Sequence, residues 1–503
     1  MKNMKKSVLL LIFITLLLAG VFIAGCTSPA PAPEQALPPN VTATNEGPLN
    51  PDYVAYQLKP EPMTTDDGYA LGDVPSPVTR PDVKDIPLFG PGVHAVETRY
   101  DLRDYNKVSP VEDQNPFSTC WAFATYGSLE STIRPNATLI FSEKNLVNLA
   151  RPGVSDAVTD LSGGIDKSMA YLTRWAGPVD EATDPYPKVT WTGSASYPVV
   201  MHVQNVILFP ARSNRTDTDN IKLALEKYGA VDSALEWSSD LFLNKSSYAY
   251  YMPASHPKIG GGHDVTIIGW DDSYPATNFK DIPPGNGAWI VKNSWGTNWG
   301  IHGFFYVSYY DKYFGSALQP DNTSKDTGII LGEPVDNYKG IYYYDPLGEC
   351  AEYYFGTTPK TSTVANRFTA TSPGTIKAIG FFSTDVHTSY KAEIYRNPTD
   401  GPAGGTPVAT FSGTLPYMGY STIVVPSENQ VRVNTGDTFS VVLTLTNPLN
   451  PDVAAVEMPR AGYCRDATSH PGESYFSTDD GRSFKDLTTT LENANFCIKV
   501  YTT

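Results

Sequence analysis

From about residue 335 to its end, the chain is a series of short runs in which apolar and polar residues alternate. Gly, Pro and Asn separate these runs, which include VANRFTA, KAIGFFS, KAEIYR, STIVVP, TFSVVLTLT and NFCIKVYT. Alternation with a period of two buries one face of a strand, and the turn residues fold each strand back on the previous one. The pattern predicts an all-β sandwich over residues 335–503.

The first 26 residues have the composition of an export signal. Lysines precede an apolar run from Val8, and the segment ends in Ile23-Ala24-Gly25-Cys26. These last four residues resemble a lipobox, which implies that Cys26 is lipidated and anchors the chain to a membrane. The alternative is a transmembrane helix that is retained, because the run is nearly long enough to span a bilayer. Either reading places the body of the chain outside the cytoplasm, at the cell surface.

Two proline-rich segments follow. Residues 27–46 are rich in Pro and Ala and have no apolar period, which predicts an extended stalk. Residues 47–96 are dense in proline and cannot form a long helix. We expect them to form a pro-like N-terminal extension that lies extended across the following domain. Whether they block a substrate groove or are a permanent part of the domain stays open.

The charge of the chain excludes one class of partner. The 53 acidic residues outnumber the 37 basic ones and give a formal net charge of -16. Such a chain repels phosphate backbones, so we expect no nucleic-acid partner.

Cys120 precedes a segment with helical spacing. In the residues after it, WAFATYGSLESTI, apolar and small side chains fall on one side of a helix, and Pro135 ends it. Cys120 is therefore placed at a helix N-terminus, where free N–H groups and the macrodipole favour a thiolate. A single cysteine before a tryptophan is more often a core residue. A catalytic role needs an imidazole and a group that orients it.

Two later segments supply both groups. GGGHDVTIIGW places His263 at the start of a predicted strand, and WIVKNSWG carries a second strand into Asn293. An asparagine can accept a hydrogen bond from one ring nitrogen and leave the other facing the sulfur. Nucleophile, base and orienting group are thus all available.

Residues 97–320 resemble the papain-like cysteine peptidases. The resemblance rests on VSPVEDQ, STCWAFA, FSEKNLVNL, LSGG, the histidine strand and NSWGTNWG. It implies an α+β papain-like fold with a helical half and a β-barrel-like half. It also implies that Cys120 is the nucleophile, His263 the base and acid, and Asn293 the group that orients the histidine.

The same resemblance assigns further site residues. Gln114 resembles the side-chain donor of the oxyanion hole, beside the Cys120 backbone N–H. Trp295 resembles the indole that covers the His–Asn hydrogen bond, and Gly163 and Gly164 the pair whose bare backbone holds an extended substrate. Asp264 stands where a small apolar residue is more common, and either lines a specificity pocket or hydrogen-bonds its own strand.

One departure from the family pattern concerns a disulfide. Papain-like enzymes usually carry a disulfide that joins the positions held here by Phe117 and Leu161. Because both cysteines are missing together, we expect apolar packing in their place.

Residues 335–503 resemble the lectin-like domain that follows the peptidase in some prokaryotic cell-surface proteins. GESYFSTDDGRSFKDL and NFCIKVYT carry this likeness. The domain either binds a cell-surface glycan or acts as a rigid spacer. Its three cysteines, Cys350, Cys464 and Cys497, allow one disulfide and one thiol, and the pairing stays open.

The sequence therefore predicts an extracytoplasmic, lipid-anchored cysteine endopeptidase that acts on protein or peptide substrates. We expect no cofactor and no catalytic metal, although a structural calcium ion in the lectin-like domain is conceivable. The alternative from another class is a surface adhesin in which the peptidase fold is a relic.

Overall fold

The computed structural model describes residues 44–58, 64–80, 86–150, 161–212, 218–238, 241–256, 260–315 and 326–503. Cys26, the export signal and residues 27–43 of the expected stalk lie outside these ranges. Within them, no helix combines the length and the apolar character that crossing a bilayer requires.

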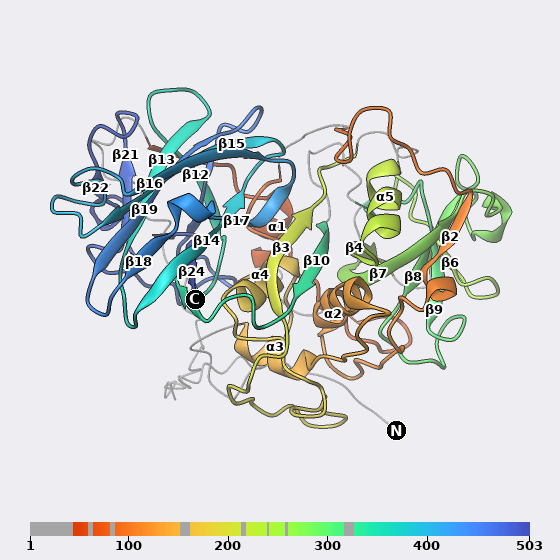
Figure 1. Cartoon of the computed structure of the whole chain (residues 1–503). Coiled ribbons are helices and arrows are strands. Elements are labelled where there is room, and N and C mark those ends of the chain that lie inside the picture. Colours follow the sequence, from red (N-terminus) through yellow and green to blue (C-terminus); the bar gives the residue numbers. More distant parts are fainter. Residues whose placement is uncertain are drawn as a thin grey trace, which may run out of the picture. The chain divides into compact units, whose positions relative to one another are not determined.

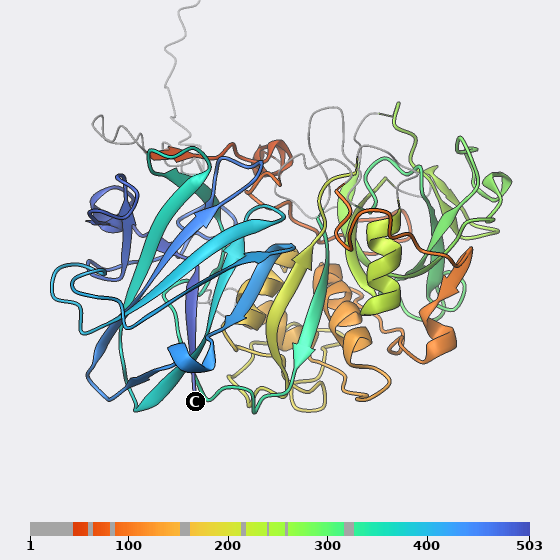
Figure 2. The same cartoon turned by 45° about the horizontal axis from the view of Figure 1, so that its top comes forward.

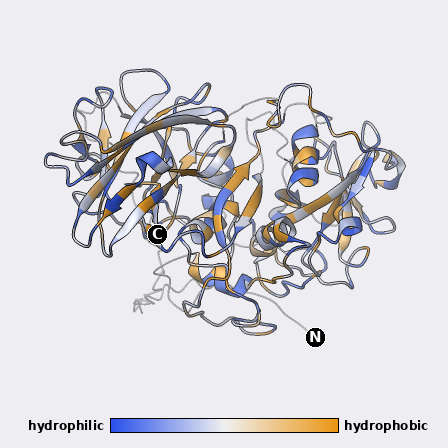
Figure 3. Cartoon of the chain, viewed as in Figure 1, coloured by the Kyte–Doolittle hydropathy of each residue, from blue (hydrophilic) through white to orange (hydrophobic). Residues whose placement is uncertain are grey.

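The α-helices of the described residues stand in the first half of the chain (Figure 1). The helix expected after Cys120 is confirmed as α2, and it is buried over almost its whole length because it packs against β4, β7 and β10. α5 shows both colours in Figure 3, because one side of it is buried and the other faces solvent. The α-helices are α1 (Pro51–Leu58), α2 (Cys120–Ile133), α3 (Glu143–Leu149), α4 (Ile165–Thr173) and α5 (Asp219–Lys227).

One large mixed sheet runs through both halves of the chain. Its path is β11-β24-β14-β17-β3-β10-β4-β7-β8-β9-β6-β5, with β18 beside β14 and β2 beside β7. The first-half strands are β2 (Arg99–Asp101), β3 (His202–Leu208), β4 (Val231–Trp237), β5 (Leu243–Asn244), β6 (Ala249–Tyr250), β7 (Gly261–Asp271), β8 (Ala288–Lys292), β9 (Phe304–Ser308) and β10 (Thr327–Glu333). The second-half strands are β11 (Gly340–Tyr342), β14 (Gly374–Ser383), β17 (Met418–Val424), β18 (Val431–Val433) and β24 (Ile498–Thr502).

A second sheet covers the C-terminal strands of the large one. Its order is β16-β15-β19-β13-β21-β22, with the bounds β13 (Thr361–Thr369), β15 (Thr388–Arg396), β16 (Ala409–Leu415), β19 (Thr438–Thr446), β21 (Ser474–Ser477) and β22 (Lys485–Asp486). Apolar side chains of both layers form one core, among them Phe368, Ile379 and Val441. All the strands expected from the six runs are present.

The two halves are less separate than the sequence indicates. β17 of the sandwich pairs with β3 of the first half, from Met418 opposite Leu208 to Tyr420 opposite Val206. One layer of the expected sandwich is therefore continuous with the peptidase-like sheet, because β3 and β17 each offer a free edge to the other.

The N-terminal extension is held by the C-terminal half. β1 (Thr44–Glu46) pairs with β12 (Ala351–Phe355) in a four-stranded sheet that β20 (Ala454–Glu457) and β23 (Asn495–Phe496) complete. In Figure 2 the red segment that carries β1 and α1 lies along this half. The Tyr53 hydroxyl on α1 donates to the Ala461 carbonyl at 2.6 Å. The last three residues of the expected stalk are thus a paired strand, since β12 offers them an open edge.

The cysteine pairing left open by the sequence is Cys350 with Cys464, and Cys497 is a buried thiol. The disulfide packs with Tyr53 and Val74 of the N-terminal extension and with Tyr463. It therefore lies where the extension meets the C-terminal half.

Candidate active site

Cys120 is the first residue of α2, as expected, and it is fully buried. The backbone N–H groups of Asp264 and Gly72 lie close enough to its sulfur to lower the pKa of the thiol, against the larger effect of burial. Asp264 follows His263 on β7, so the cysteine lies against the start of the histidine strand. Gly72 belongs to the N-terminal extension.

His263 is held by the end of β8. Its Nε2 lies 2.9 Å from Asn293 Oδ1, and Asn293 directly follows β8, the neighbour of β7 in the sheet. The Asn293 oxygen accepts from Nε2–H, which fixes the tautomer and leaves Nδ1 unprotonated in the neutral ring. Among the described residues, Nδ1 has no hydrogen-bond partner. The arrangement leaves this nitrogen available to a nearby thiol.

Trp295 lies flat on the histidine. The two rings stack with centroids 4.5 Å apart and planes 20° apart. Tyr69 of the N-terminal extension also stacks on the indole, with ring centroids 4.7 Å apart and planes 16° apart. Trp295 therefore shields the histidine from solvent and offers an aromatic surface to a chain that passes the site.

Residues 64–80, called the strap below, run across this site. The carbonyl of Ala70 accepts a hydrogen bond from Gln114 Nε2 at 3.0 Å. Gln114 is fully buried, and its Oε1 accepts from the Ser294 hydroxyl at 2.6 Å, which fixes the direction of the amide. The group that the sequence predicts to hold an oxyanion thus holds a peptide carbonyl.

The strap pairs with backbone on both sides of the site. The Gly163 N–H donates to the Gly72 carbonyl at 2.9 Å, and the Gly163 carbonyl accepts from the Val74 N–H at 2.6 Å. Opposite, the Asp73 N–H donates to the Gly262 carbonyl at 3.1 Å. We call the backbone of Gly163 and Gly262 the track, because it binds an extended chain from two sides. The structure thus brings Gly163 to an extended polypeptide.

Glycine is required on both partners by close packing. A Cβ on Gly163 would lie 2.4 Å from the Trp121 ring, and one on Gly72 would lie 2.3 Å from the Ser118 carbonyl oxygen. Gly164 is less crowded, with the Val74 carbonyl oxygen 3.0 Å from its Cβ position. Bare backbone therefore lets the strap lie directly over the residues that precede Cys120.

Burial sets the protonation of the covered site. It raises the pKa of the Cys120 thiol well above its ordinary value, and the charge of Asp264 adds to this. Burial also lowers the pKa of His263 to about 4, against the hydrogen bond to Asn293, which raises it. The thiolate expected at a helix N-terminus is not favoured here, because the strap excludes the water that would stabilise both charges.

Asp264 is buried on β7, opposite Ala234 of β4. Its carboxylate lies near enough to Cys120 to disfavour the thiolate. It also borders a small cavity behind α2 that Glu130, Glu143 and Lys292 line. These contacts place Asp264 beside Cys120, and its two expected roles stay predictions.

Apolar packing replaces the disulfide that is missing between positions 117 and 161. Phe117 contacts the rings of Tyr186 and Trp191, at 6.1 and 5.0 Å between centroids. The Leu161 side chain is buried, and its carbonyl accepts from Trp121 Nε1 at 2.9 Å. The loop before Cys120 is thus held by aromatic contacts.

The sequence did not identify the residues by which the strap binds, Ala70, Gly72, Asp73 and Arg80. The signal that was present is a glycine between two proline-rich stretches, which is too common to point to a site. No metal site emerges from the described part of the chain, where no three His, Cys, Asp or Glu side chains are grouped as ligands.

Comparison with known proteins gives two matches along the chain. Residues 96–318 match the papain family cysteine protease, and residues 341–502 match the lectin like domain. Among curated proteins, cysteine proteinase 2 of Dictyostelium discoideum is 28% identical over 41% of this chain and 61% of its own length. Procathepsin L of Felis catus is 29% identical over 42% of this chain and 60% of its own. The chain therefore spans about 60% of the length of these relatives.

Two solved structures are similar to both halves. The cysteine protease and lectin-like domains of Cwp84, a surface layer associated protein of Clostridium difficile, align with a TM-score of 0.71 and 25% identity, over 93% of this chain and 99% of that one. Clostridial Cwp84 after propeptide cleavage aligns with a TM-score of 0.65 and 27% identity, over 81% and 99%.

Proposed function

Residues 96–318 belong to the papain family of cysteine proteases and residues 341–502 form a lectin-like domain, and from this premise we propose that the chain is an endopeptidase whose nucleophile is Cys120. The observation that carries the proposal is the strap itself. An extended polypeptide is bound from two sides by the backbone of Gly163 and Gly262, and one of its carbonyls accepts a hydrogen bond from Gln114.

The chemistry proposed uses residues already in place. With the strap displaced, His263 Nδ1 takes the thiol proton, and the Cys120 sulfur attacks the substrate carbonyl. Gln114 Nε2 and the Cys120 backbone N–H stabilise the oxyanion, because they are fixed before the charge develops. His263 then protonates the leaving amine, and a water molecule releases the acyl-enzyme. Asn293 keeps the ring in the required tautomer.

The strap acts as an inhibitor in this proposal. It occupies the track, the Gln114 amide and the Trp295 ring together, so no second chain can bind while it is present. The solved form of Cwp84 after propeptide cleavage supports removal of such a segment in a relative. We further propose, from the surface-layer association of Cwp84 and the N-terminal signal, that this chain works at the cell surface, lipid-anchored through Cys26.

For the lectin-like domain we propose binding of a cell-surface glycan. A structural calcium ion there remains an expectation. The adhesin alternative is not favoured, because Cys120, His263, Asn293 and Gln114 are all present and His263 and Asn293 are hydrogen-bonded.

The test uses the full chain with Gly72→Val, which is meant to displace the strap. Hydrolysis of a casein or fluorogenic peptide substrate and labelling by an epoxide-type thiol inhibitor are measured. We expect Cys120→Ala and His263→Ala each to reduce hydrolysis to background, because residues that act as a unit are strongly non-additive. Asn293→Ala should reduce it less. Unchanged hydrolysis by Cys120→Ala would exclude the proposed mechanism.

A further inference from the structure

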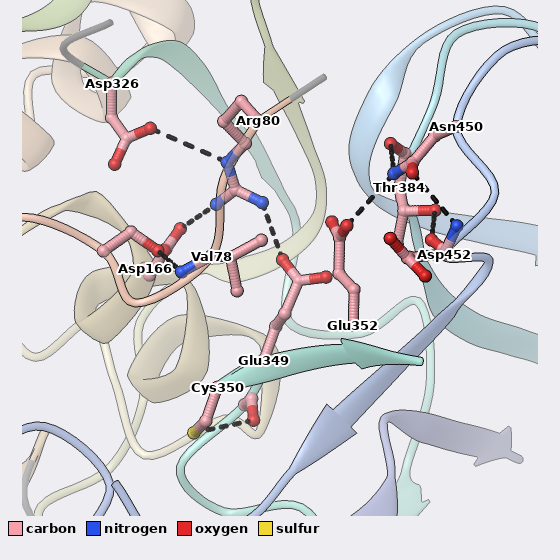
Figure 4. Close-up of polar contacts among 12 residues, drawn as sticks. Val78, Arg80, Asp166, Asp326, Glu349, Cys350, Glu352, Thr384, Asn450 and Asp452 are labelled. Carbon is pink, nitrogen blue, oxygen red and sulfur yellow. Dashed lines mark hydrogen bonds and ion pairs between the residues drawn. The ribbon is translucent and has the colours of Figure 1, made fainter. Parts of the chain in front are cut away.

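Arg80, at the end of the strap, is bound by three carboxylates from three parts of the chain. Its Nη2 lies 2.5 Å from Asp166, its Nη1 2.8 Å from Glu349 and its Nε 3.6 Å from Asp326 (Figure 4). Asp166 belongs to α4, Asp326 directly precedes β10, and Glu349 belongs to the lectin-like domain. We call these three carboxylates the clamp.

The clamp is built into the interior. The side chains of Arg80, Asp166 and Glu349 are only 6%, 2% and 2% exposed. One oxygen of Asp166 and one of Glu349 are buried without a hydrogen-bond partner in the described part of the chain. A buried carboxylate that loses its cation is strongly unfavourable. The buried carboxylates of the clamp are therefore neutralised only when a cation lies between them.

The clamp lies beside the track. Asp166 is in the first turn of α4, which begins directly after Gly163 and Gly164. Val74 bonds Gly163, and six residues further along the strap Arg80 bonds Asp166, three residues after Gly163.

The Tyr463 ring of the lectin-like domain lies near both the clamp and the part of the strap that binds the track. It packs with Val74 and the disulfide. The charges that act on its hydroxyl include those of Asp166 and Asp326 in the clamp, and that of Asp73, the strap residue that bonds Gly262 of the track. Lys167, the cation next to Asp166, has its Nζ over this ring and near the Ser162 carbonyl.

We propose that the clamp is a substrate subsite for an arginine side chain, which Arg80 occupies while the strap is bound. This inference rests on the proposed peptidase function and names its substrate class: polypeptides with arginine within a few residues of the cleaved bond, on the side bound by Gly163. Each guanidinium nitrogen of Arg80 faces its own carboxylate, which suits the planar fork of arginine better than the point charge of lysine. The lectin-like domain thus contributes Glu349 to substrate selection.

The first test asks whether the clamp binds a guanidinium. In the full chain with Arg80→Ala, 10 mM ethylguanidinium should raise the thermal midpoint, whereas N-ethylurea, its neutral counterpart, should not. Adding Glu349→Gln should remove the effect. Equal shifts with both compounds, or none, would overturn the proposal. If Arg80→Ala does not fold, Arg80→Gln keeps most of the side-chain volume and serves the same comparison.

The second test asks whether the subsite serves substrates. Peptide pairs that differ only by arginine or citrulline at one of four positions before the cleaved bond are bound to the full chain with Gly72→Val, Arg80→Ala and Cys120→Ala. We expect arginine at one position to bind at least tenfold more tightly, as measured by fluorescence anisotropy, and Asp166→Asn to reduce that ratio below threefold. Asp104→Asn, an exposed carboxylate outside the clamp, is the matched control.

The two proposals fail in different ways. Suppose that the peptides bind with the arginine preference, but that the chain with Gly72→Val and Arg80→Ala, in which Cys120 is kept, does not hydrolyse them. The peptidase function then fails and the subsite stands. If they are hydrolysed but arginine and citrulline bind equally at every position, the subsite is wrong and the peptidase function stands.

Discussion

The carbonyl of Ala70 accepts a hydrogen bond from Gln114 Nε2 at 3.0 Å, at the place where an oxyanion is expected to form. This contact makes the strap a ligand of the machinery it covers. The site should therefore behave differently while the strap covers it and after the strap has left.

Gly72→Val should release the strap and increase peptide hydrolysis by the full chain at least tenfold. The valine side chain would meet the Ser118 carbonyl oxygen, 2.3 Å from the Cβ position. Because this oxygen belongs to the backbone just before α2, it cannot rotate away as a flexible side chain would. Hydrolysis of a fluorogenic peptide is the measurement. Asp66→Ala, at an exposed position of the strap, is the control and should change nothing. A folded Gly72→Val chain no more active than the control would mean that the strap is a permanent part of the domain.

Gln114→Ala in the Gly72→Val chain should lower kcat by on the order of 10² to 10³, the usual cost of losing one oxyanion donor. Labelling of Cys120 by a thiol reagent should persist, because the thiol and His263 are untouched. Steady-state kinetics with one peptide substrate give the answer. A kcat within about twofold of the parent would assign the oxyanion to another donor.

The pH dependence of Cys120 labelling should differ between the two states. In the intact chain, burial raises the pKa of the thiol and lowers the pKa of His263 to about 4, so both partners stay neutral near pH 6. Iodoacetamide should therefore react slowly with Cys120 near pH 6. The reaction should become faster only as the pH rises through the alkaline range. Gly72→Val readmits water and should label at least tenfold faster at pH 6. Identical pH profiles for the two chains would contradict this account.

Ionisation of Glu130 should lower the free energy of unfolding as the pH rises. Burial raises its pKa from 4.5 to about 7, against the influence of Lys292. A raised carboxyl pKa gives stability that is fully present below pH 4.5 and lost as the pH rises through 7, on the order of 3 kcal/mol for such a shift. Glu130→Gln cannot ionise and still offers an oxygen to the Phe141 N–H.

Urea unfolding at pH 4.5 and pH 8 measures this effect. The free energy of unfolding should decrease less in Glu130→Gln than in the parent, whereas Glu428→Gln, at an exposed position, should follow the parent. The same decrease in all three chains would assign the pH dependence to other groups.

Local patterns were enough to predict the elements that carry the site. Helical spacing after Cys120 and the alternating runs around His263 and before Asn293 correspond to α2, β7 and β8. Each of these elements is defined by its own side chains, so a single sequence contains the information. The roles of the residues on them came from the family resemblance and stay predictions.

Contacts between distant segments could not be predicted in this way. The strap has no apolar period, and its place depends on single contacts, such as Ala70 with Gln114, that leave no trace in composition. The choice of Cys464 rather than Cys497 as the partner of Cys350 depends on which strands bring the sulfurs together. The pairing of β17 with β3 likewise needs both folded edges.

Cys120 shares its chain with a disulfide, Cys350–Cys464, which forms only where thiols are oxidised. Oxidants attack thiolates that solvent can reach, and sulfenic acid or a mixed disulfide at Cys120 would inactivate the proposed nucleophile. Under the strap, Cys120 is fully buried and protonated, which removes both conditions. The segment that we propose as the inhibitor therefore also protects the sulfur. Cys120 is kept reduced in surroundings that oxidise Cys350 and Cys464, until the strap leaves.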